Sequence, residues 1–292
     1  MFDDFKLSMI DTGEAIIKTR YGGNGLPLLL LHGHPQTQVM WHKIAGRLAQ
    51  DFTVVATDLR GYGDSSKPPT TPNHEPYSKR AQARDQIEVM RQLGFEKFFV
   101  AGHDRGGHCA QRMAIEYPEK ISKIAVLDIV PIAELFRHPD GREFGLEYWG
   151  WFFLAQPFDL PERLIGADPD YYYWHRRWKD EIPDFFTREA FAEYRRCFNN
   201  PENIHAFCED YRANASVDFA LEEADRKNNR RIACPLLALW SKRDELEKWY
   251  DVLAIWREWA TDVRGRAIDC GHYLAEEAPD EVYAELRMFF AE

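Results

Sequence analysis

The sequence lacks several features that would assign it to a specialised class of protein. Its five cysteines are an odd number without metal-like spacing, which favours reduced thiols in a cytoplasm over a disulfide framework. The first residues have neither the basic lead nor the apolar run of a signal peptide. The apolar stretch from Leu26 to Leu31 is far too short to cross a membrane. We therefore expect a cytoplasmic protein with no membrane partner.

An excess of positive charge is also absent. The formal net charge is −11 at pH 7, with 48 acidic residues against 37 lysines and arginines. A nucleic-acid partner would require basic side chains gathered on one face, so we expect none. The same negative charge repels small anions at long range, and an anionic substrate would have to be held by local positive groups.

What the sequence does contain is enough apolar material for a large core. The chain has 292 residues, of which 45% are hydrophobic and 14% aromatic. Short apolar runs alternate with segments of helical periodicity, and this alternation indicates a mostly parallel sheet with helices on both faces, the α/β class. The expected strands are 28–31, 54–56, 98–101, 124–127, 236–240 and 263–268, and the expected helices are 78–93, 107–117, 248–259 and a last one from 279.

The middle of the chain, 132–225, interrupts this alternation. It is crowded with aromatic residues and has helical periodicity without the alternation typical of strands. We interpret it as a helical cap domain inserted into a core domain made of 1–131 and 226–292. Most of the rings are expected to pack in a second small core, and a minority to line a pocket against the core domain.

The strongest candidate for a reactive group is Asp104. It lies in Gly102-His103-Asp104-Arg105-Gly106, between an apolar strand and a helix, where a strained turn would expose the middle side chain beyond the carboxyl ends of the strands. The flanking glycines suit a turn that has no room for Cβ atoms. A plain helix N-cap is the alternative role of this Asp. The strand–turn–helix context favours a nucleophile.

An aspartate at such a turn, where hydrolases of acyl esters have Ser, changes the chemistry. A carboxylate attacks carbonyl groups poorly, because the anhydride product is unfavourable, but it can displace a leaving group from an sp³ carbon and form an alkyl ester. Water activated by a histidine can then hydrolyse that ester. The sequence therefore predicts an enzyme with a covalent aspartyl-ester intermediate and makes ordinary esterase activity a poor candidate.

The base is predicted to be His272, on the loop after the last expected strand. The chain order of nucleophile, acid and base matches that of hydrolases with a nucleophile at such a turn. A carboxylate has to fix the imidazole tautomer, and both Asp128 and Asp244 follow strands, so spacing alone leaves both open. The turn at His32-Gly33-His34-Pro35 is the expected oxyanion site, where the backbone N–H groups of His34 and Arg105 would hold the ester oxygen.

Seven stretches of the chain resemble the haloacetate (fluoroacetate) dehalogenases, which have the α/β-hydrolase fold. The likeness covers nearly the whole chain, and Arg105 is its most discriminating feature, because haloalkane dehalogenases and epoxide hydrolases usually have Trp directly after the nucleophile. The stretches are His32-Gly33-His34-Pro35-Gln36-Thr37, Asp58-Leu59-Arg60-Gly61-Tyr62-Gly63, Gly102-His103-Asp104-Arg105-Gly106-Gly107, Asp128-Ile129-Val130-Pro131, Phe153-Leu154-Ala155-Gln156-Pro157, Cys208-Glu209-Asp210-Tyr211-Arg212 and Gly271-His272-Tyr273.

The resemblance implies hydrolysis of a small 2-haloacid to a 2-hydroxyacid and halide, with no metal and no organic cofactor. It makes Asp128 the acid and Arg105 the clamp on the substrate carboxylate. It implies that Trp151 and Tyr211, from the cap, donate hydrogen bonds to the departing halide, with packing within the cap as their alternative role. Dimers are common among enzymes of this kind, so a homodimer is one expected assembly.

Three positions depart from the family pattern. His108 stands where the family has a second Arg, and a neutral imidazole cannot form the bidentate carboxylate pair, a loss of roughly 2–5 kcal/mol unless protonation of His108 compensates. Gly150 replaces a His that donates to the halide, and His34 replaces a Phe. We therefore expect chloro- and bromoacids to be turned over better than fluoroacetate.

Two other functions are compatible with the sequence. An epoxide hydrolase would use the same three residues with cap tyrosines such as Tyr148, Tyr171 to Tyr173 and Tyr211 as acids, but Arg105 has little purpose beside a neutral epoxide. A non-catalytic binding protein on this scaffold is the second alternative, and it predicts that Asp104→Asn and the wild type behave alike.

Overall fold

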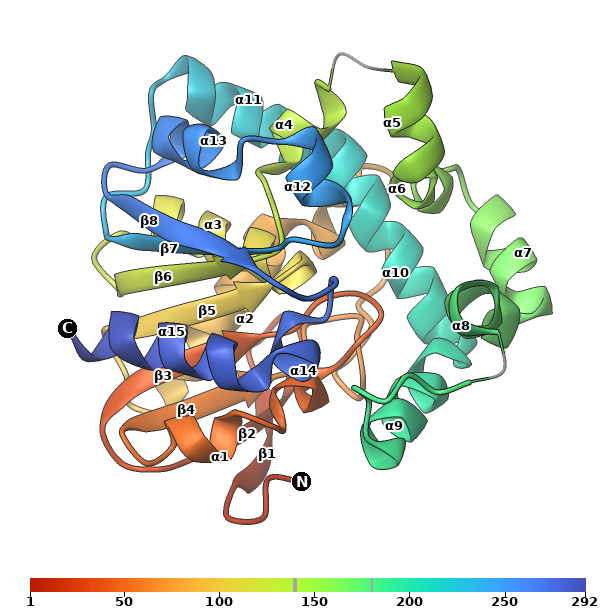
Figure 1. Ribbon diagram of the computed structural model, residues 1–292. Helices are drawn as coiled ribbons and strands as arrows, with labels where there is room; N and C mark the ends of the chain where they lie inside the picture. Colours follow the sequence, from red (N-terminus) through yellow and green to blue (C-terminus); the bar gives the residue numbers. More distant parts are fainter. Residues whose placement is uncertain (139–140, 180) are drawn as a thin grey trace.

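An eight-stranded sheet forms the centre of the molecule (Figure 1). The computed structural model describes residues 1–138, 141–179 and 181–292. The strands lie in the order β1-β2-β4-β3-β5-β6-β7-β8; the six from β3 to β8 are mutually parallel, and β2 is antiparallel to both of its neighbours. Their bounds are β1 Lys6–Asp11, β2 Ile16–Gly22, β3 Leu26–Leu31, β4 Phe52–Thr57, β5 Phe98–His103, β6 Ile121–Leu127, β7 Leu236–Ser241 and β8 Val263–Ile268.

Helices cover the sheet on both faces, which confirms the predicted α/β class. In Figure 1, α2 (Lys79–Gln92) and α3 (Arg105–Glu116) lie behind the sheet, whereas α1 (Ala45–Leu48) and α15 (Pro279–Ala291) lie in front of it. The central strands are therefore buried from both sides, and every residue of β5 is buried. This double cover explains why these strands are continuous apolar runs in the sequence.

The expected elements of the two ends of the chain differ from the structure in two places. The helix expected at 248–259 is two helices, α12 (Glu245–Trp249) and α13 (Val252–Trp259), because Tyr250 is extended and the Asp251 carboxylate caps α13 by accepting from the Ala254 N–H at 3.0 Å. The strands β1 and β2 were not expected from the sequence. The outer strand β1 is mostly exposed and so has little apolar periodicity.

The segment between β6 and β7 consists of helices, on the right of Figure 1, and no strand occurs among its described residues. This agrees with the predicted helical character, while the division into two domains at 132 and 225 remains a prediction; residues 139, 140 and 180 of that range lie outside the described residues. The helices are α4 Ile132–Phe136, α5 Gly141–Glu147, α6 Trp149–Leu154, α7 Leu160–Ala167, the π-helix η3 Tyr171–His175, α8 Arg176–Trp178, α9 Arg188–Phe198, α10 Pro201–Ala213, the π-helix η4 Asn214–Asp218 and α11 Phe219–Lys227.

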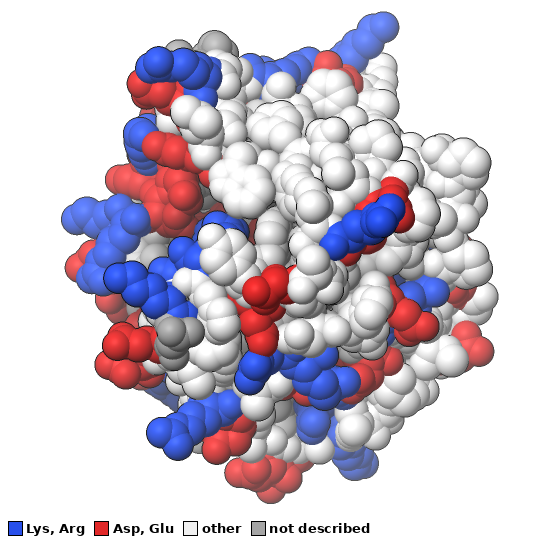
Figure 2. Space-filling view, turned by 90° about the vertical axis from the view of Figure 1, so that its right-hand side faces the viewer, with Lys and Arg blue, Asp and Glu red and all other residues white. Residues whose placement is uncertain are grey.

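These inserted helices present a surface with few charges. Figure 2 looks onto this side of the molecule and shows a broad area without Lys, Arg, Asp or Glu. Leu146, Phe158 and Leu164, all in the inserted segment, are 72%, 70% and 58% exposed. Among the described residues, no helix is long and apolar enough to cross a bilayer.

Candidate active site

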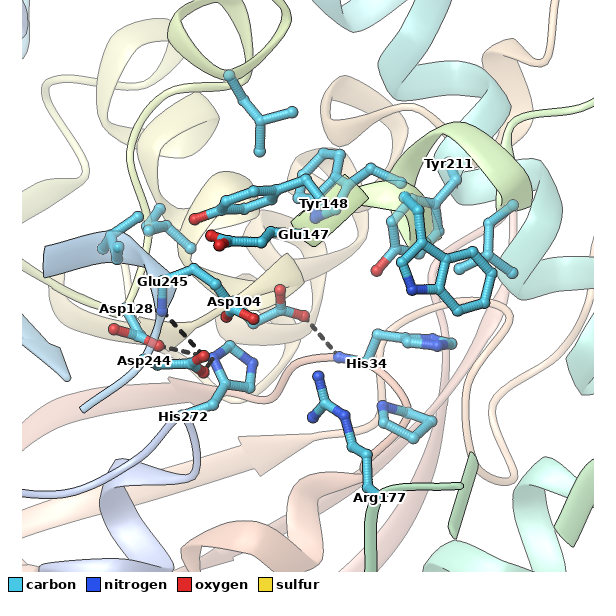
Figure 3. A pocket seen from close by; sticks show the side chains of 18 of the residues that line it. His34, Asp104, Asp128, Glu147, Tyr148, Arg177, Tyr211, Asp244, Glu245 and His272 are labelled. Atoms are coloured by element: carbon cyan, nitrogen blue, oxygen red, sulfur yellow. Dashed lines mark hydrogen bonds and ion pairs between the residues drawn. The ribbon is translucent and has the colours of Figure 1, made fainter. Parts of the chain in front are cut away.

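Asp104 occupies the sharp turn between β5 and α3. Its backbone has φ 48° and ψ −119°, a conformation that is rare for a residue with a side chain. A Cβ atom on Gly102 would lie 2.2 Å from the carbonyl oxygen of Gly106, so the turn closes only with glycine at this position. The carboxylate lies in the wall of a cavity of about 350 Å³ between the sheet and the inserted helices (Figure 3).

The Asp104 carboxylate is held in its ionised form. Its Oδ1 accepts the backbone N–H of His34 at 2.7 Å, and a Cβ on Gly33 would lie only 2.6 Å from the same oxygen. Burial by itself would raise the pKa of Asp104, but the nearby charges of His272 and Arg105 outweigh it and hold the pKa well below its usual range. One of the two predicted oxyanion donors therefore already contacts the carboxylate.

His272 lies on the loop after β8, beside two carboxylates. Its Nδ1 is 2.6 Å from Oδ2 of Asp128 and 3.9 Å from Oδ2 of Asp244 (Figure 3). The other oxygen of Asp128 accepts the backbone N–H of Ser241 at 2.7 Å, which fixes the carboxylate in place. Spacing in the sequence left both acids open; in the structure only Asp128 lies at hydrogen-bond distance from the imidazole.

Several charges act on the His272 imidazole. Burial opposes its protonation, but the hydrogen bond to Asp128 and the negative charges of Asp128, Asp104 and Asp244 raise the pKa of His272 to about 9. The unreacted site therefore pairs an imidazolium with the Asp104 carboxylate. Nδ1 is committed to Asp128, which leaves Nε2 available to a water molecule.

Asp244 has a second role as a helix cap. Its Oδ1 accepts the backbone N–H of Glu245 at 2.9 Å at the start of α12. Burial and the adjacent Asp244 raise the pKa of Glu245 to about 7. Donor atoms of Asp128, Asp244 and His272 lie within 4.8 Å of one another, so they are the described residues with a geometry suited to a metal ion. The hydrogen bonds of Asp128 to His272 and Ser241 already engage both of its oxygens.

Arg105, the predicted carboxylate clamp, is tied to the inserted helices. Its Nε and Nη2 donate to the two carboxylate oxygens of Asp210 in α10, at 2.9 and 3.2 Å. The guanidinium carbon lies 4.7 Å from the Trp151 ring centroid and 4.2 Å from that of Tyr211, so Arg105 sits behind two residues that line the cavity rather than in its wall. Its Nη1 is buried and has no hydrogen-bond partner among the described residues.

Asp210 accepts hydrogen bonds from two cationic side chains. Lys79 in α2 donates to Oδ1 of Asp210 at 2.7 Å, in addition to the pair with Arg105. All three side chains are buried. The negative charge of Asp218 also acts on Lys79, while burial and the charge of Arg105 lower the pKa of Lys79. What this buried cluster leaves for an anionic ligand is the unpartnered Nη1 of Arg105.

The three positions that depart from the family pattern, His34, His108 and Gly150, all line the cavity. His108 is buried in α3, and burial together with the charges of Arg105 and Lys79 lowers its pKa well below the ordinary value. His108 is therefore neutral, and the compensation by a protonated His108 considered from the sequence is disfavoured. Gly150 in α6 faces open space, because a Cβ there would meet no atom within 4 Å.

The predicted halide donors meet at one end of the cavity. The rings of Trp151 and Tyr211 pack edge to face with centroids 5.2 Å apart, and both residues line the cavity (Figure 3 labels Tyr211). Within the described part of the chain, neither the Trp151 indole N–H nor the Tyr211 hydroxyl has a hydrogen-bond partner. Both groups are therefore available to donate to a ligand.

Sequence reasoning missed the roles of several residues of this site. His103 donates from Nε2 to the backbone carbonyl of His272 at 2.7 Å, and burial lowers the pKa of His103 to about 3, so a neutral ring holds the loop of the base. Glu147 and Arg177 also line the cavity. The roles of His103, Glu147 and Arg177 could not be predicted from the sequence, because their contacts join residues that are far apart in the chain.

Comparisons with known proteins agree with this geometry. A family model described as alpha/beta hydrolase fold matches residues 27–279. A fluoroacetate dehalogenase of Burkholderia sp. is 40% identical over 100% of this chain and 96% of its own length, and a soluble epoxide hydrolase of Corynebacterium sp. is 32% identical over 92% and 91%. The crystal structure of a putative alpha/beta hydrolase from Nostoc sp. superposes with a TM-score of 0.96, at 52% identity and full coverage of both chains.

Proposed function

The chain belongs to the alpha/beta hydrolase fold family and, within it, to the family of the fluoroacetate dehalogenases, and from this premise we propose that it hydrolyses 2-haloacids to 2-hydroxyacids and halide. The observation that carries the proposal is the ionised carboxylate of Asp104, set in a cavity beside His272 at the position where an esterase needs a hydroxyl. A carboxylate suits displacement at an sp³ carbon. A cytoplasmic location belongs to the same proposal.

In the first half of the reaction, Asp104 displaces the halide. The His34 N–H occupies Oδ1, so Oδ2 is the oxygen that attacks the substrate carbon. A carbon–oxygen bond forms while the carbon–halogen bond breaks, and the halide leaves with the bonding electron pair. Trp151 and Tyr211 donate to the departing halide, and the free Nη1 of Arg105 donates to the substrate carboxylate.

In the second half, His272 activates water. Esterification removes the negative charge of Asp104, one of the charges that raise the pKa of His272, so the imidazole releases its proton and becomes a base. Nε2 takes a proton from water while Asp128 holds Nδ1–H. The hydroxide adds to the ester carbon, the backbone N–H groups of His34 and Arg105 hold the oxyanion, and the 2-hydroxyacid leaves with the proton from His272.

An isotope experiment tests the proposal. The protein is incubated with fluoro-, chloro- and bromoacetate in ¹⁸O water, and halide release is measured. After a single turnover, the mass of the peptide that contains Asp104 is measured by mass spectrometry. We expect halide release with label in that peptide, because water attacks the ester carbon of Asp104. Product without label means that water attacks the substrate directly, and equal behaviour of Asp104→Asn and wild type means that the protein is a non-catalytic binding protein.

The order of substrates is a second part of the proposal. Chloride release from chloroacetate is expected to exceed fluoride release from fluoroacetate under equal conditions, because Gly150 supplies no donor to fluoride. The reverse order would refute this part and leave the covalent mechanism unaffected.

Epoxide hydrolysis is the second candidate, favoured by two phenols in the cavity. Tyr148 and Tyr211 both line it and could protonate the oxygen of an opening epoxide, and a soluble epoxide hydrolase is among the relatives. The unpartnered Nη1 of Arg105 argues for an anionic substrate instead. Assays of styrene oxide beside chloroacetate separate the two functions, and diol formation that Tyr148→Phe abolishes would favour the epoxide.

A further inference from the structure

A second arginine reaches the cavity from the inserted helices. Arg177 lies in α8, directly after the π-helix η3, and its side chain lines the cavity. Figure 3 shows its guanidinium directed at the space between His272 and His34. Arg177 forms no ion pair with any residue that the structure describes, but its side chain hydrogen-bonds to Tyr273, and the nearby charges of Asp244 and Glu245 act on it. Its guanidinium has further N–H groups that can donate to a ligand.

The neighbours of Arg177 fix its position. The adjacent Trp178 packs on Tyr273, with ring centroids 5.9 Å apart, and Tyr273 follows the base His272. Arg176, in contrast, is engaged: its Nε donates to the backbone carbonyl of Tyr172 at 2.6 Å, and its guanidinium carbon lies 5.1 Å from the Trp149 ring centroid. Both arginines line the cavity, and Arg177 is the one whose guanidinium Figure 3 shows directed into it.

The cavity offers room for a substrate longer than a haloacetate. Its volume of about 350 Å³ equals that of about twelve water molecules in the liquid, at roughly 30 Å³ each. Chloroacetate held at the Tyr211 side of the cavity, with its carboxylate directed toward Nη1 of Arg105, fills only a part of this space. Figure 3 shows Tyr211 and Arg177 on different sides of the cavity, so the remaining space extends toward a second positive group.

Three carboxylates in the cavity wall are compensated. Glu147 accepts hydrogen bonds from the Lys248 ammonium and from the Trp249 indole N–H. Asp244 caps α12, and the pKa of Glu245 is raised to about 7 by burial and by Asp244, which keeps much of it neutral at neutral pH. These acidic residues therefore offset the positive charge of Arg177 only in part.

We propose that Arg177 binds a second carboxylate of the substrate, so that the preferred substrates are 2-haloacids with a carboxylate at each end, one at Arg105 and the other at Arg177. This inference rests on the proposed function, which supplies the first carboxylate and the reacting carbon. It also accounts for how a protein with a net charge of −11 binds a dianion, because two local positive groups lie at the cavity.

Binding of unreactive ligands tests the site without turnover. Titration calorimetry on the full chain compares succinate, butyrate and 4-aminobutyrate, which share one carboxylate and a similar length. We expect succinate to bind about tenfold more tightly than butyrate at low salt, and this preference to shrink at high salt. Equal binding of succinate and butyrate, or tighter binding of 4-aminobutyrate, overturns the proposal.

Matched variants assign the preference to one side chain. Arg177→Gln should abolish the preference for succinate, Arg177→Lys should keep most of it, and Arg176→Gln should leave it unchanged, with circular dichroism confirming the fold of each variant. A succinate preference that survives in Arg177→Gln overturns the proposal.

Turnover separates this inference from the proposed function. We expect Arg177→Gln to lower kcat/KM for 2-chlorosuccinate about tenfold more than it lowers kcat/KM for chloroacetate, mainly through KM. If no haloacid is hydrolysed but Arg177 sets the succinate preference, the proposed function fails and the anion site stands. If chloroacetate is hydrolysed and the succinate preference is absent, the proposed function stands and this inference fails.

Discussion

Asp104 and His272 carry opposite charges in the unreacted site, and the proposed mechanism depends on how each charge changes. The carboxylate is ionised because His272, Arg105 and the His34 N–H stabilise its negative charge. The imidazole is protonated because Asp128, Asp104 and Asp244 surround it. Alkylation of Asp104 removes its negative charge and so lowers the pKa of His272. In the proposed mechanism, formation of the base is therefore coupled to the first chemical step.

The pH dependence of the ester intermediate follows from this coupling. Hydrolysis of the alkyl-enzyme requires a neutral His272, so we expect the intermediate to accumulate at pH 5–6 and to be scarce near pH 9. Rapid-quench mass spectrometry of the whole protein with chloroacetate measures the adduct. Asp244→Asn should shift the acid limb of kcat to lower pH by roughly 0.5–1 unit, because it removes one charge that raises the pKa of His272. An unshifted limb would show that Asp244 acts only as a cap.

Gly150 allows a direct test of the halide pocket. Because a side chain at this position meets open space, Gly150→His should fit and add a donor beside Trp151. We expect fluoride release from fluoroacetate to rise about tenfold relative to chloride release from chloroacetate, measured with ion-selective electrodes. Gly150→Ala, which adds a Cβ without a donor, is the control and should not change this ratio. An equal gain in both variants would attribute the effect to helix stability.

At the scale of elements, buried ion pairs join the inserted helices to the helices of the sheet. Arg112 in α3 donates to Asp225 in α11 at 2.6 Å, and both side chains are buried. The pair of Arg105 with Asp210 and that of Lys79 with the same carboxylate connect α3 and α2 to α10. The helix that carries the nucleophile is thus also the helix that positions the inserted segment over it.

The Arg112–Asp225 pair yields a stability prediction. Asp225→Asn leaves the buried Arg112 without its closest negative partner, and we expect the free energy of unfolding to fall by about 3–5 kcal/mol in urea titrations. Arg112→Met combined with Asp225→Leu should recover at least half of that loss, because no buried arginine is left without a partner; Arg230, which also pairs with Asp225, is 45% exposed. A double variant as unstable as the single one would point to lost packing instead.

At the scale of the whole molecule, buried acids make stability depend on pH. Burial raises the pKa of Glu222 to about 8, from an ordinary value of 4.5, although its Oε2 accepts the Ala133 N–H at 2.8 Å. A carboxyl group with a raised folded-state pKa contributes stability in full below about pH 4.5 and loses it as the pH rises through 8.

Glu222→Gln removes that dependence. We expect the difference in free energy of unfolding between variant and wild type to move in favour of the variant by up to a few kcal/mol from pH 5 to pH 9, measured by urea titration at each pH. Glu223→Gln, on the same helix and paired with Arg137 at the surface, is the control and should show little such change. A pH-independent difference for Glu222→Gln would contradict burial of an ionisable group at this position.

Self-association is the other prediction for the whole molecule. Soluble monomers rarely expose large contiguous apolar areas, and the face of the inserted helices in Figure 2 has few charges. We therefore retain the homodimer expected from the sequence as a prediction. Sedimentation equilibrium should give about twice the 34.2 kDa mass of the chain, and a mass that stays at that of one chain up to high concentration would contradict it.

The sequence alone determined the fold class and indicated Asp104 as the candidate nucleophile. Central strands show up as apolar runs because helices bury them from both faces, and the turn at Asp104 is readable because its glycines and its place between strand and helix are local features. The sequence did not predict the exposed strand β1 or the break between α12 and α13, because neither has a strong local periodicity.

Only the tertiary structure decided which charges meet. It placed Asp128 at 2.6 Å and Asp244 at 3.9 Å from the imidazole, although both follow strands at comparable places in the sequence. It paired Arg105 with Asp210 and brought Arg177 to the cavity. Residue types fix what a group can do, whereas distances between side chains of different elements arise from packing, and electrostatic energy depends on those distances.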